Sequence, residues 1–229
     1  MRVFAIGDLH LPGNYDKPMN VFGIKWDNHF SSIQSNWKAN VRAEDVVLIP
    51  GDISWAMRLE DAKEDLDAVA ALPGIKILLR GNHDYWWSSV SKVRVMLDKR
   101  ASVLQNDSIS VNGLVFAGTR GWICPGTPGF DSADERIYKR EVQRLRLSLD
   151  SAQKGRQVIA MMHFPPFNDR QQASGFTDLL EEYGIKHVIY AHLHGKSCEN
   201  AFEGNLRGIN YTLCSADHLN FCPKLVFEN

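Results

Sequence analysis

The chain has 229 residues, of which 44% are hydrophobic, and its formal net charge is −1. A chain of this length and composition can bury one substantial core, as a single domain or as a domain with an insertion. The near-neutral charge gives no sign of a nucleic-acid or anionic-membrane partner, although a net charge hides any local basic patch.

Short runs rich in Val, Ile and Leu recur along the chain and predict β-strands. Their near-continuous apolar character is typical of strands that are buried on both faces, as in a sheet covered by helices. In chain order, these runs are residues 2–6, 45–50, 75–80, 114–118, 157–162 and 187–191.

Helical patterns alternate with these runs. Residues 58–72 carry apolar side chains at helical spacing, and the pair Pro73-Gly74 predicts the end of that helix. In the C-terminal part the helical periodicity disappears, and residues 206–214 and 224–228 predict antiparallel strands. Further helical patterns occupy residues 88–97, 134–149 and 177–184.

This order of elements predicts an α/β fold that becomes α+β towards the C-terminus, with two packed sheets and helices outside. Residues 11–30 and 119–135 interrupt the alternation, and both stretches are rich in Gly and Pro. Long loops in compact domains are usually functional or disordered, and the aromatic residues in these two argue against disorder. We therefore expect one domain over residues 1–229, with loop insertions near 11–30 and 119–135.

Polar side chains of the kind that bind metals follow five of the predicted strands. In open α/β sheets, side chains beyond the carboxyl ends of the strands share one crevice, so residues far apart in the sequence converge there. The side chains in question are Asp8, His10, Asp52, Asn82, His163, His192 and His194.

Each of these residues alone has a simpler explanation. An Asp after a strand commonly caps a turn or helix, and a lone His commonly packs within the core. Even the stretch Gly81-Asn82-His83-Asp84, read alone, is compatible with an ordinary turn. The repetition after five hydrophobic runs favours a shared site.

The number of donors predicts two metal ions rather than one. A single ion takes about four to six ligands, so the set suits two ions that share a bridging carboxylate. Asp52 is the natural bridge because its strand should lie between the others. Two divalent cations outweigh the charges of Asp8 and Asp52, and the positive site that remains suits a phosphate ester.

The ordered set D-x-H, G-D, G-N-H-D, H and H-x-H-G resembles the calcineurin-like metallophosphoesterases. The blocks read GDLH, GDIS, GNHD, MMHFPP and AHLHG, and they extend from Asp8 to Gly195. The resemblance implies a four-layer α/β/β/α sandwich of two mixed β-sheets flanked by helices, with a dinuclear site between the sheet edges.

The resemblance also implies a role for each residue of the motifs. In the family, the His of GNHD is not a ligand, and it donates to the scissile phosphate or protonates the leaving oxygen. Here that residue is His83, with Asp84 as the expected partner that holds the other imidazole nitrogen. One metal is assigned to Asp8, His10, Asp52 and His194. The other metal is assigned to Asp52, Asn82, His163 and His192.

We therefore expect a dinuclear-metal-dependent phosphohydrolase that cleaves phosphomono- or phosphodiester bonds by in-line attack of a metal-bridging hydroxide. Imidazole, carboxylate and amide donors without a thiolate favour Mn²⁺, with Fe or Zn²⁺ as alternatives. The expected partner is a small phosphorylated substrate, and the sequence leaves the oligomeric state open.

Two other functions remain as alternatives. A nuclease acting on nucleic-acid ends would use the same centre, but the near-neutral charge and the lack of a basic run argue against it. A non-catalytic, metal-bound scaffold for protein interactions typically loses ligands, whereas this chain keeps every ligand position and His83.

Aromatic residues lie close to the motifs in the sequence. Residues 85–87 and Trp55 either stack on a base or sugar of the substrate or pack between neighbouring helices. Three loop residues, Arg120, Trp122 and Arg170, either bind the rest of the substrate or are plain surface and packing residues.

The cysteines and the N-terminus indicate the compartment. The chain has four scattered cysteines and no CxxC pair, as is typical of reduced thiols in the cytosol. The N-terminal apolar stretch is too short for a signal peptide, and no run approaches the roughly 20 apolar residues of a membrane span. We expect a cytoplasmic protein with no membrane partner.

Overall fold

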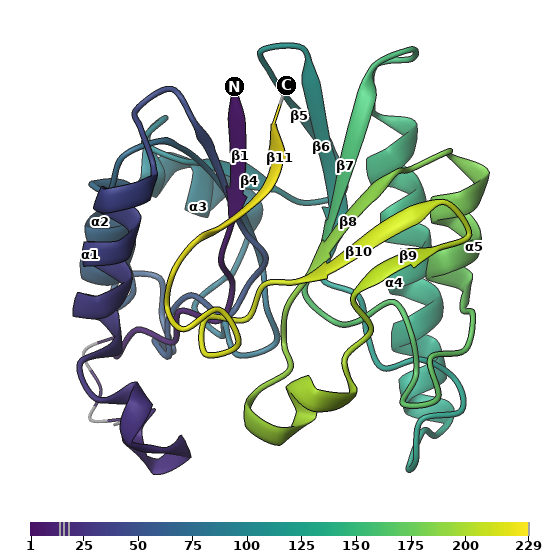
Figure 1. The fold of residues 1–229 in the computed structure, drawn as a ribbon, viewed down its shortest axis with the longest axis horizontal. Helices are drawn as coiled ribbons and strands as arrows, with labels where there is room; N and C mark the ends of the chain where they lie inside the picture. The colour runs from purple at the N-terminus through teal and green to yellow at the C-terminus, as the bar shows by residue number, and fades with distance from the viewer. Residues whose placement is uncertain (14, 16, 18, 229) are drawn as a thin grey trace.

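Two mixed β-sheets packed face to face form the centre of the molecule (Figure 1). The structure, a computed structural model, describes residues 1–13, 15, 17 and 19–228. The first sheet has the order β11-β1-β2-β3-β4 and the second has the order β5-β6-β7-β8-β10-β9. The first half of the chain thus builds one sheet and the second half builds the other, except that β11 returns to the first.

The strands of the first sheet run parallel from β1 to β4, and β11 pairs antiparallel with β1. Their bounds are β1 Arg2–Ala5, β2 Val46–Ile49, β3 Ile75–Leu79, β4 Ser102–Leu104 and β11 Lys224–Glu228. In the second sheet β6, β7, β8 and β10 are parallel, whereas the edge strands β5 and β9 are antiparallel to their neighbours. Their bounds are β5 Ser108–Val111, β6 Leu114–Thr119, β7 Gln157–Met162, β8 His187–Tyr190, β9 Gly204–Leu206 and β10 Ile209–Leu213.

Helices cover the outer face of each sheet, on opposite sides of the molecule in Figure 1. The helices beside the first sheet are α1 His29–Asn40, α2 Lys63–Ala70 and α3 Val90–Leu97. Those beside the second sheet are α4 Ser132–Asp150 and α5 Gly175–Glu182. Short 3-10 helices occupy Met19–Phe22, Ile24–Trp26 and Gly195–Asn200. The result is the expected four-layer α/β/β/α sandwich.

The apolar strands divide their side chains between two cores. In β1, Val3 and Ala5 point into the core between the two sheets, while Phe4 packs in the core under α1 to α3. In β7 the same alternation sends Ile159 to the core between the sheets and Ala160 to the core under α4 and α5. Successive side chains of a strand point to opposite faces, so a strand between two cores must be apolar throughout.

Most of the predicted elements are present, with shifted ends. The six apolar runs are all strands, and the helix predicted over 58–72 is shorter, at Lys63–Ala70. The strand predicted over 206–214 is β9 and β10, which are antiparallel to each other, but β10 runs parallel to β8. The predicted loop 11–30 contains two 3-10 helices and the start of α1, and its residues 14, 16 and 18 lie outside the described residues.

Helix α1, strands β4 and β5 and the short 3-10 helices were not predicted. Helix α1 buries only Ile33 and Trp37, so its polar sequence carries little helical signal. Strands β4 and β5 are only three and four residues long, which is too short for a clear period. Among the described residues, no helix combines the length and the apolar character that a membrane span requires.

Candidate metal centre

The polar side chains that follow the strands meet at one edge of the sandwich. Two groups of three ligand atoms form there, and within each group all atoms lie within 4.8 Å of one another. Each group combines residues from both sheets. The first is Asp8, His10 and His194, and the second is Asp52, His163 and His192.

In the first group, side-chain nitrogen and oxygen atoms of different residues lie close to one another. The Nε2 atoms of His10 and His194 are 3.2 Å apart, and Asp8 Oδ2 lies 3.9 Å from His194 Nε2. Asp52 Oδ2 lies 3.8 Å from His10 Nε2, so this carboxylate also reaches the first group.

The second group surrounds the amide oxygen of Asn82. Asn82 Oδ1 is 2.6 Å from His163 Nε2 and 3.0 Å from His192 Nδ1. Asp52 Oδ2 lies 3.5 Å from His163 Nε2. The same oxygen is therefore within 3.8 Å of a nitrogen of each group, which is the position that a bridging carboxylate occupies.

The burial and the missing hydrogen bonds of these side chains are suited to cation binding. Asp8 is fully buried, and its Oδ1 has no hydrogen-bond partner in the described part of the chain. Burial raises the pKa of Asp8 to about 6 and lowers the pKa of His192 to about 3, so each side chain resists its charged form. A cluster of imidazoles and carboxylates with a buried, unpartnered carboxylate oxygen is an environment that a divalent cation satisfies.

Outer hydrogen bonds fix which nitrogen of the His163 and His194 imidazoles faces the centre. His163 Nδ1 lies 2.9 Å from the carbonyl oxygen of Pro50, and His194 Nδ1 lies 3.0 Å from Asp217 Oδ1. Each Nδ1–H donates to that oxygen, which leaves Nε2 free to bind an ion. Asp217 was missed in the sequence, although it follows β10 much as the ligands follow their strands.

The turns after the strands adopt an unusual backbone conformation. Asp8, His10, Asp52 and His192 have φ values of 56°, 46°, 50° and 76°, in the left-handed region that disfavours residues with a Cβ. Gly81 lies so close to Asp52 that a Cβ at this position would be 2.1 Å from Asp52 Oδ1. Strained backbone of this kind clusters at functional sites, where the surrounding structure holds it in place.

Asp84 does not hold His83, and that expectation is wrong. The buried Asp84 carboxylate accepts hydrogen bonds from five donors instead. The backbone N–H groups of Asp52 and Gly81 donate to Oδ2, while those of Ile53 and Ser54, together with Trp86 Nε1, donate to Oδ1. Asp84 therefore ties the turn after β2 to the turn after β3.

His83 lies at the mouth of the centre. Its backbone N–H donates to Asp52 Oδ1 at 2.8 Å, and its ring is 4.6 Å from the ring of Trp55 and 6.0 Å from that of His10. Tyr85 is the nearest partner of its side chain, with the hydroxyl 3.5 Å from Nδ1. A cavity of about 160 Å³ opens here, lined by His10, Met19, Phe22, Asp52, Trp55, His83, His192 and His194.

The aromatic candidates separate into two kinds. Trp86 and Trp87 are buried in the core under α1 to α3, and Trp87 Nε1 donates to Gln105. Trp55 instead stacks on His10 with ring centroids 4.8 Å apart and lines the cavity. Trp55 is therefore the one of these three residues that a bound molecule can touch.

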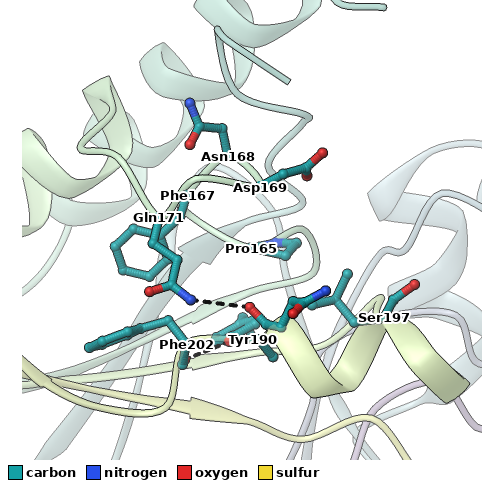
Figure 2. Close-up of a pocket in the computed structure, with 11 residues that line it drawn as sticks. Pro165, Phe167, Asn168, Asp169, Gln171, Tyr190, Ser197 and Phe202 are labelled. Carbon is teal, nitrogen blue, oxygen red and sulfur yellow. Dashed lines mark hydrogen bonds between the residues drawn. The ribbon is translucent and has the colours of Figure 1, made fainter. Parts of the chain in front are cut away.

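A second cavity lies beside the loop that carries His192 and His194 (Figure 2). It has a volume of about 310 Å³, and its lining includes Leu193, Pro165 and the aromatic side chains of Phe167, Tyr190 and Phe202. The Tyr190 hydroxyl donates to the carbonyl oxygen of Phe202 at 2.6 Å, shown by the short dashed line between these two residues in Figure 2. None of the seven ligand residues lines this cavity, so it is distinct from the metal centre.

Comparisons with known proteins agree with this arrangement. A family model described as calcineurin-like phosphoesterase matches residues 1–196. No curated protein matches the chain.

Solved structures with the same fold have little sequence in common with this chain. Phosphopantetheinyl hydrolase (PptH) from Mycobacterium tuberculosis superimposes with a TM-score of 0.57 at 14% identity, covering 93% of this chain and 88% of that one. The protein of unknown function AQ665 from Aquifex aeolicus has a TM-score of 0.52 at 16% identity, covering 97% of this chain and 94% of that one. At these identities the likeness shows the fold alone.

Proposed function

Since the chain belongs to the calcineurin-like phosphoesterase family, and is thereby a metal-dependent phosphoesterase, we propose that it works with two divalent ions bound at the strand ends. The observation that carries this proposal is the convergence of two ligand groups on the carboxylate of Asp52. Two neighbouring ions suit a phosphate ester, because together they hold the attacking and leaving oxygens.

The proposed ligand sets follow the distances. Both sets include Asp52, whose Oδ2 lies near a nitrogen of each group. Asn82 joins the second set because its amide oxygen lies between two imidazole nitrogens of that group. The first ion is assigned to Asp8, His10, Asp52 and His194, and the second to Asp52, Asn82, His163 and His192.

When bound, the ions supply a hydroxide nucleophile near neutral pH and neutralise charge on the phosphoryl oxygens, which suits in-line displacement. The residues of the chain orient the ester and supply a proton donor. We assign that role to His83, which lines the cavity beside the ligands. Its imidazole donates a hydrogen bond to the scissile phosphate or protonates the leaving oxygen.

Asp84 has a different part in the proposal. Its five hydrogen bonds hold the backbone of Asp52 and Gly81, and so it positions the proposed bridge and the turn that carries Asn82. Asp84 is thus a positioning residue and not a catalytic one.

The donor set favours Mn²⁺, with Fe or Zn²⁺ as alternatives. The two groups offer imidazole nitrogens and carboxylate oxygens, and Asn82 adds an amide oxygen. The four cysteines are absent from both groups, which disfavours soft metals. The substrate is a small phosphomonoester or phosphodiester whose organic part contacts Trp55.

The test is hydrolysis with and without metal. Chelator-treated protein is assayed on p-nitrophenyl phosphate and bis(p-nitrophenyl) phosphate, before and after addition of Mn²⁺, Fe²⁺ or Zn²⁺, and bound metal is measured by elemental analysis. We expect turnover of at least one ester only after metal is restored. Asp52→Ala should lose bound metal and turnover together, because it removes a ligand of both ions.

Two results would redirect the proposal. Full metal loading without turnover of either ester would favour the interaction scaffold. Cleavage of oligonucleotide ends, with an affinity that falls steeply as salt rises, would favour the nuclease.

A further inference from the structure

A third cavity, separate from the metal centre, has three arginines among its lining residues. It has a volume of about 170 Å³ and lies where β3 and β4 of the first sheet and β6 of the second end. The side chains of Arg80, Arg120 and Arg144 line it, and Glu141 is the one acidic residue among its lining residues. We call it the arginine cavity.

The single carboxylate cannot balance three guanidinium groups. Glu141 is fully buried, and its two oxygens already accept hydrogen bonds from the Thr119 hydroxyl at 2.7 Å and from Arg144 Nη1 at 2.8 Å. Arg120 lies farther away, with Nη2 3.5 Å from Glu141 Oε1. The lining residues therefore carry more positive charge than Glu141 offsets.

Two of the arginines also have unused donors. The Nε atoms of Arg80 and Arg120 are buried and have no hydrogen-bond partner among the described residues. Burial lowers the pKa of Arg120, and the charges of Arg80 and Arg144 lower it further against the opposing effect of Glu141. Buried donors without partners cost free energy, so each requires an explanation such as an absent anion.

Several arginines elsewhere in the chain each have a carboxylate partner of their own. Arg2 pairs with Asp45, Arg146 with Glu182 and Arg207 with Glu181. Arg120 and Arg144 share the single carboxylate of Glu141, and no ion pair involves Arg80 among the described residues.

We propose that the arginine cavity binds a phosphate-type oxyanion through Arg80, Arg120 and Arg144, at a site separate from the two metal ions. Guanidinium groups present planar forks of N–H donors that match the oxygens of phosphate, and hydrogen bonds between charged groups are the strong ones. Gln105 also lines the cavity, and its side-chain oxygen accepts a hydrogen bond from Trp87 Nε1.

The arginine cavity adjoins the second ligand group through the backbone. Arg80 directly precedes Gly81 and Asn82, and the carbonyl oxygen of Arg120 accepts the N–H groups of His163 and Phe164 at 3.1 and 2.9 Å. The bound anion is either a second phosphoryl group of the substrate or free inorganic phosphate. The first of these sources rests on the proposed function, whereas binding itself does not.

Binding is tested on metal-free protein, so that the metal centre cannot hold the anion. Inorganic phosphate is titrated by calorimetry into chelator-treated wild type, Arg80→Gln and the control Arg156→Gln, which removes an exposed arginine. We expect saturable binding by wild type and by the control, and an affinity on the order of 10- to 100-fold weaker in Arg80→Gln. Arg80→Lys keeps the positive charge but lacks the forked guanidinium donors, and its affinity for phosphate should lie between those of wild type and Arg80→Gln.

The proposal fails if metal-free wild type does not bind phosphate, or if folded Arg80→Gln binds it as wild type does. Circular dichroism and thermal melting establish that each variant is folded. Arg80 has no ion pair to lose among the described residues, so we expect its melting temperature in phosphate-free buffer to equal or exceed that of wild type.

A kinetic arm distinguishes the two sources of the anion. KM is compared, with Mn²⁺ present, for sugar bisphosphates and for the matching monophosphates. If the anion belongs to the substrate, Arg80→Gln raises the ratio of the bisphosphate KM to the monophosphate KM about tenfold or more. If the anion is free phosphate, added phosphate alters the wild-type rate and Arg80→Gln loses that response. Failure of all turnover would refute the proposed function and leave the calorimetric result standing.

Discussion

The substitution Asp84→Asn tests whether one buried carboxylate holds the metal-binding turns in place. The change keeps the shape of the side chain but replaces one acceptor oxygen by an NH2 group, which donates. Asp84 is fully buried and accepts from five donors, so neither of its oxygens is free to become a donor without loss.

The structure gives the size of the effect. In the better orientation, the Asn oxygen replaces Oδ1 and keeps the donors Ile53, Ser54 and Trp86. Its NH2 group then faces the N–H groups of Asp52 and Gly81, which were 2.9 and 2.7 Å from Oδ2. Two buried donors lose their acceptor at about 1–3 kcal/mol each, so we expect a loss of about 2–6 kcal/mol in the free energy of unfolding.

The assay is urea unfolding of chelator-treated protein, which separates stability from metal binding. Asp169→Asn is the matched control, because Asp169 is exposed, and its free energy of unfolding should stay within about 0.5 kcal/mol of wild type. An Asp84→Asn protein within about 1 kcal/mol of wild type would refute the reasoning. A lost rate at unchanged stability would instead return Asp84 to a role beside His83.

Three further substitutions test single contacts of the centre. Gly81→Ala should weaken metal binding more than tenfold, since its Cβ would press on the rigid backbone of Asp52 at 2.2 Å; undiminished affinity in calorimetry would contradict this. Asp217→Asn should lower metal affinity about 10- to 100-fold, because His194 loses the carboxylate that orients it; an unchanged metal titration would count against that role. His83→Ala should keep its metal content and lose about 10²- to 10⁴-fold in turnover, and full activity would remove His83 from the mechanism.

Sequence patterns predicted the buried part of the fold well because each central strand lies between two cores. A strand such as β7 is apolar on both faces, and this produces a run that stands out from its surroundings. Helix α1 lacked such a signal, since it buries Ile33 and Trp37 fully and Phe30 only in part. The short strands β4 and β5 gain their stability from pairing with β3 and β6, which a local pattern does not reveal.

The candidate site was predictable to the extent that it follows from strand direction. Parallel strands place their carboxyl ends at one edge, which brings Asp8, Asn82 and His192 together from distant segments. Asp217 escaped notice because β10 was expected to be antiparallel, whereas its pairing with β8 is parallel and sends residue 217 to the same edge. Adjacency in the sequence suggested a contact between Asp84 and His83, whereas both oxygens of Asp84 accept hydrogen bonds from other donors.

The origin of the ligands in two different sheets has a mechanical consequence. Asp8 and Asp52 extend from the N-terminal sheet, while His163 and His194 extend from the C-terminal one. Each ion would link the two sheets. A free ion concentration one hundred times its Kd would raise the free energy of unfolding by about 2.7 kcal/mol. Removal of the ions by a chelator should therefore lower the free energy of unfolding of the whole molecule as well as abolish turnover.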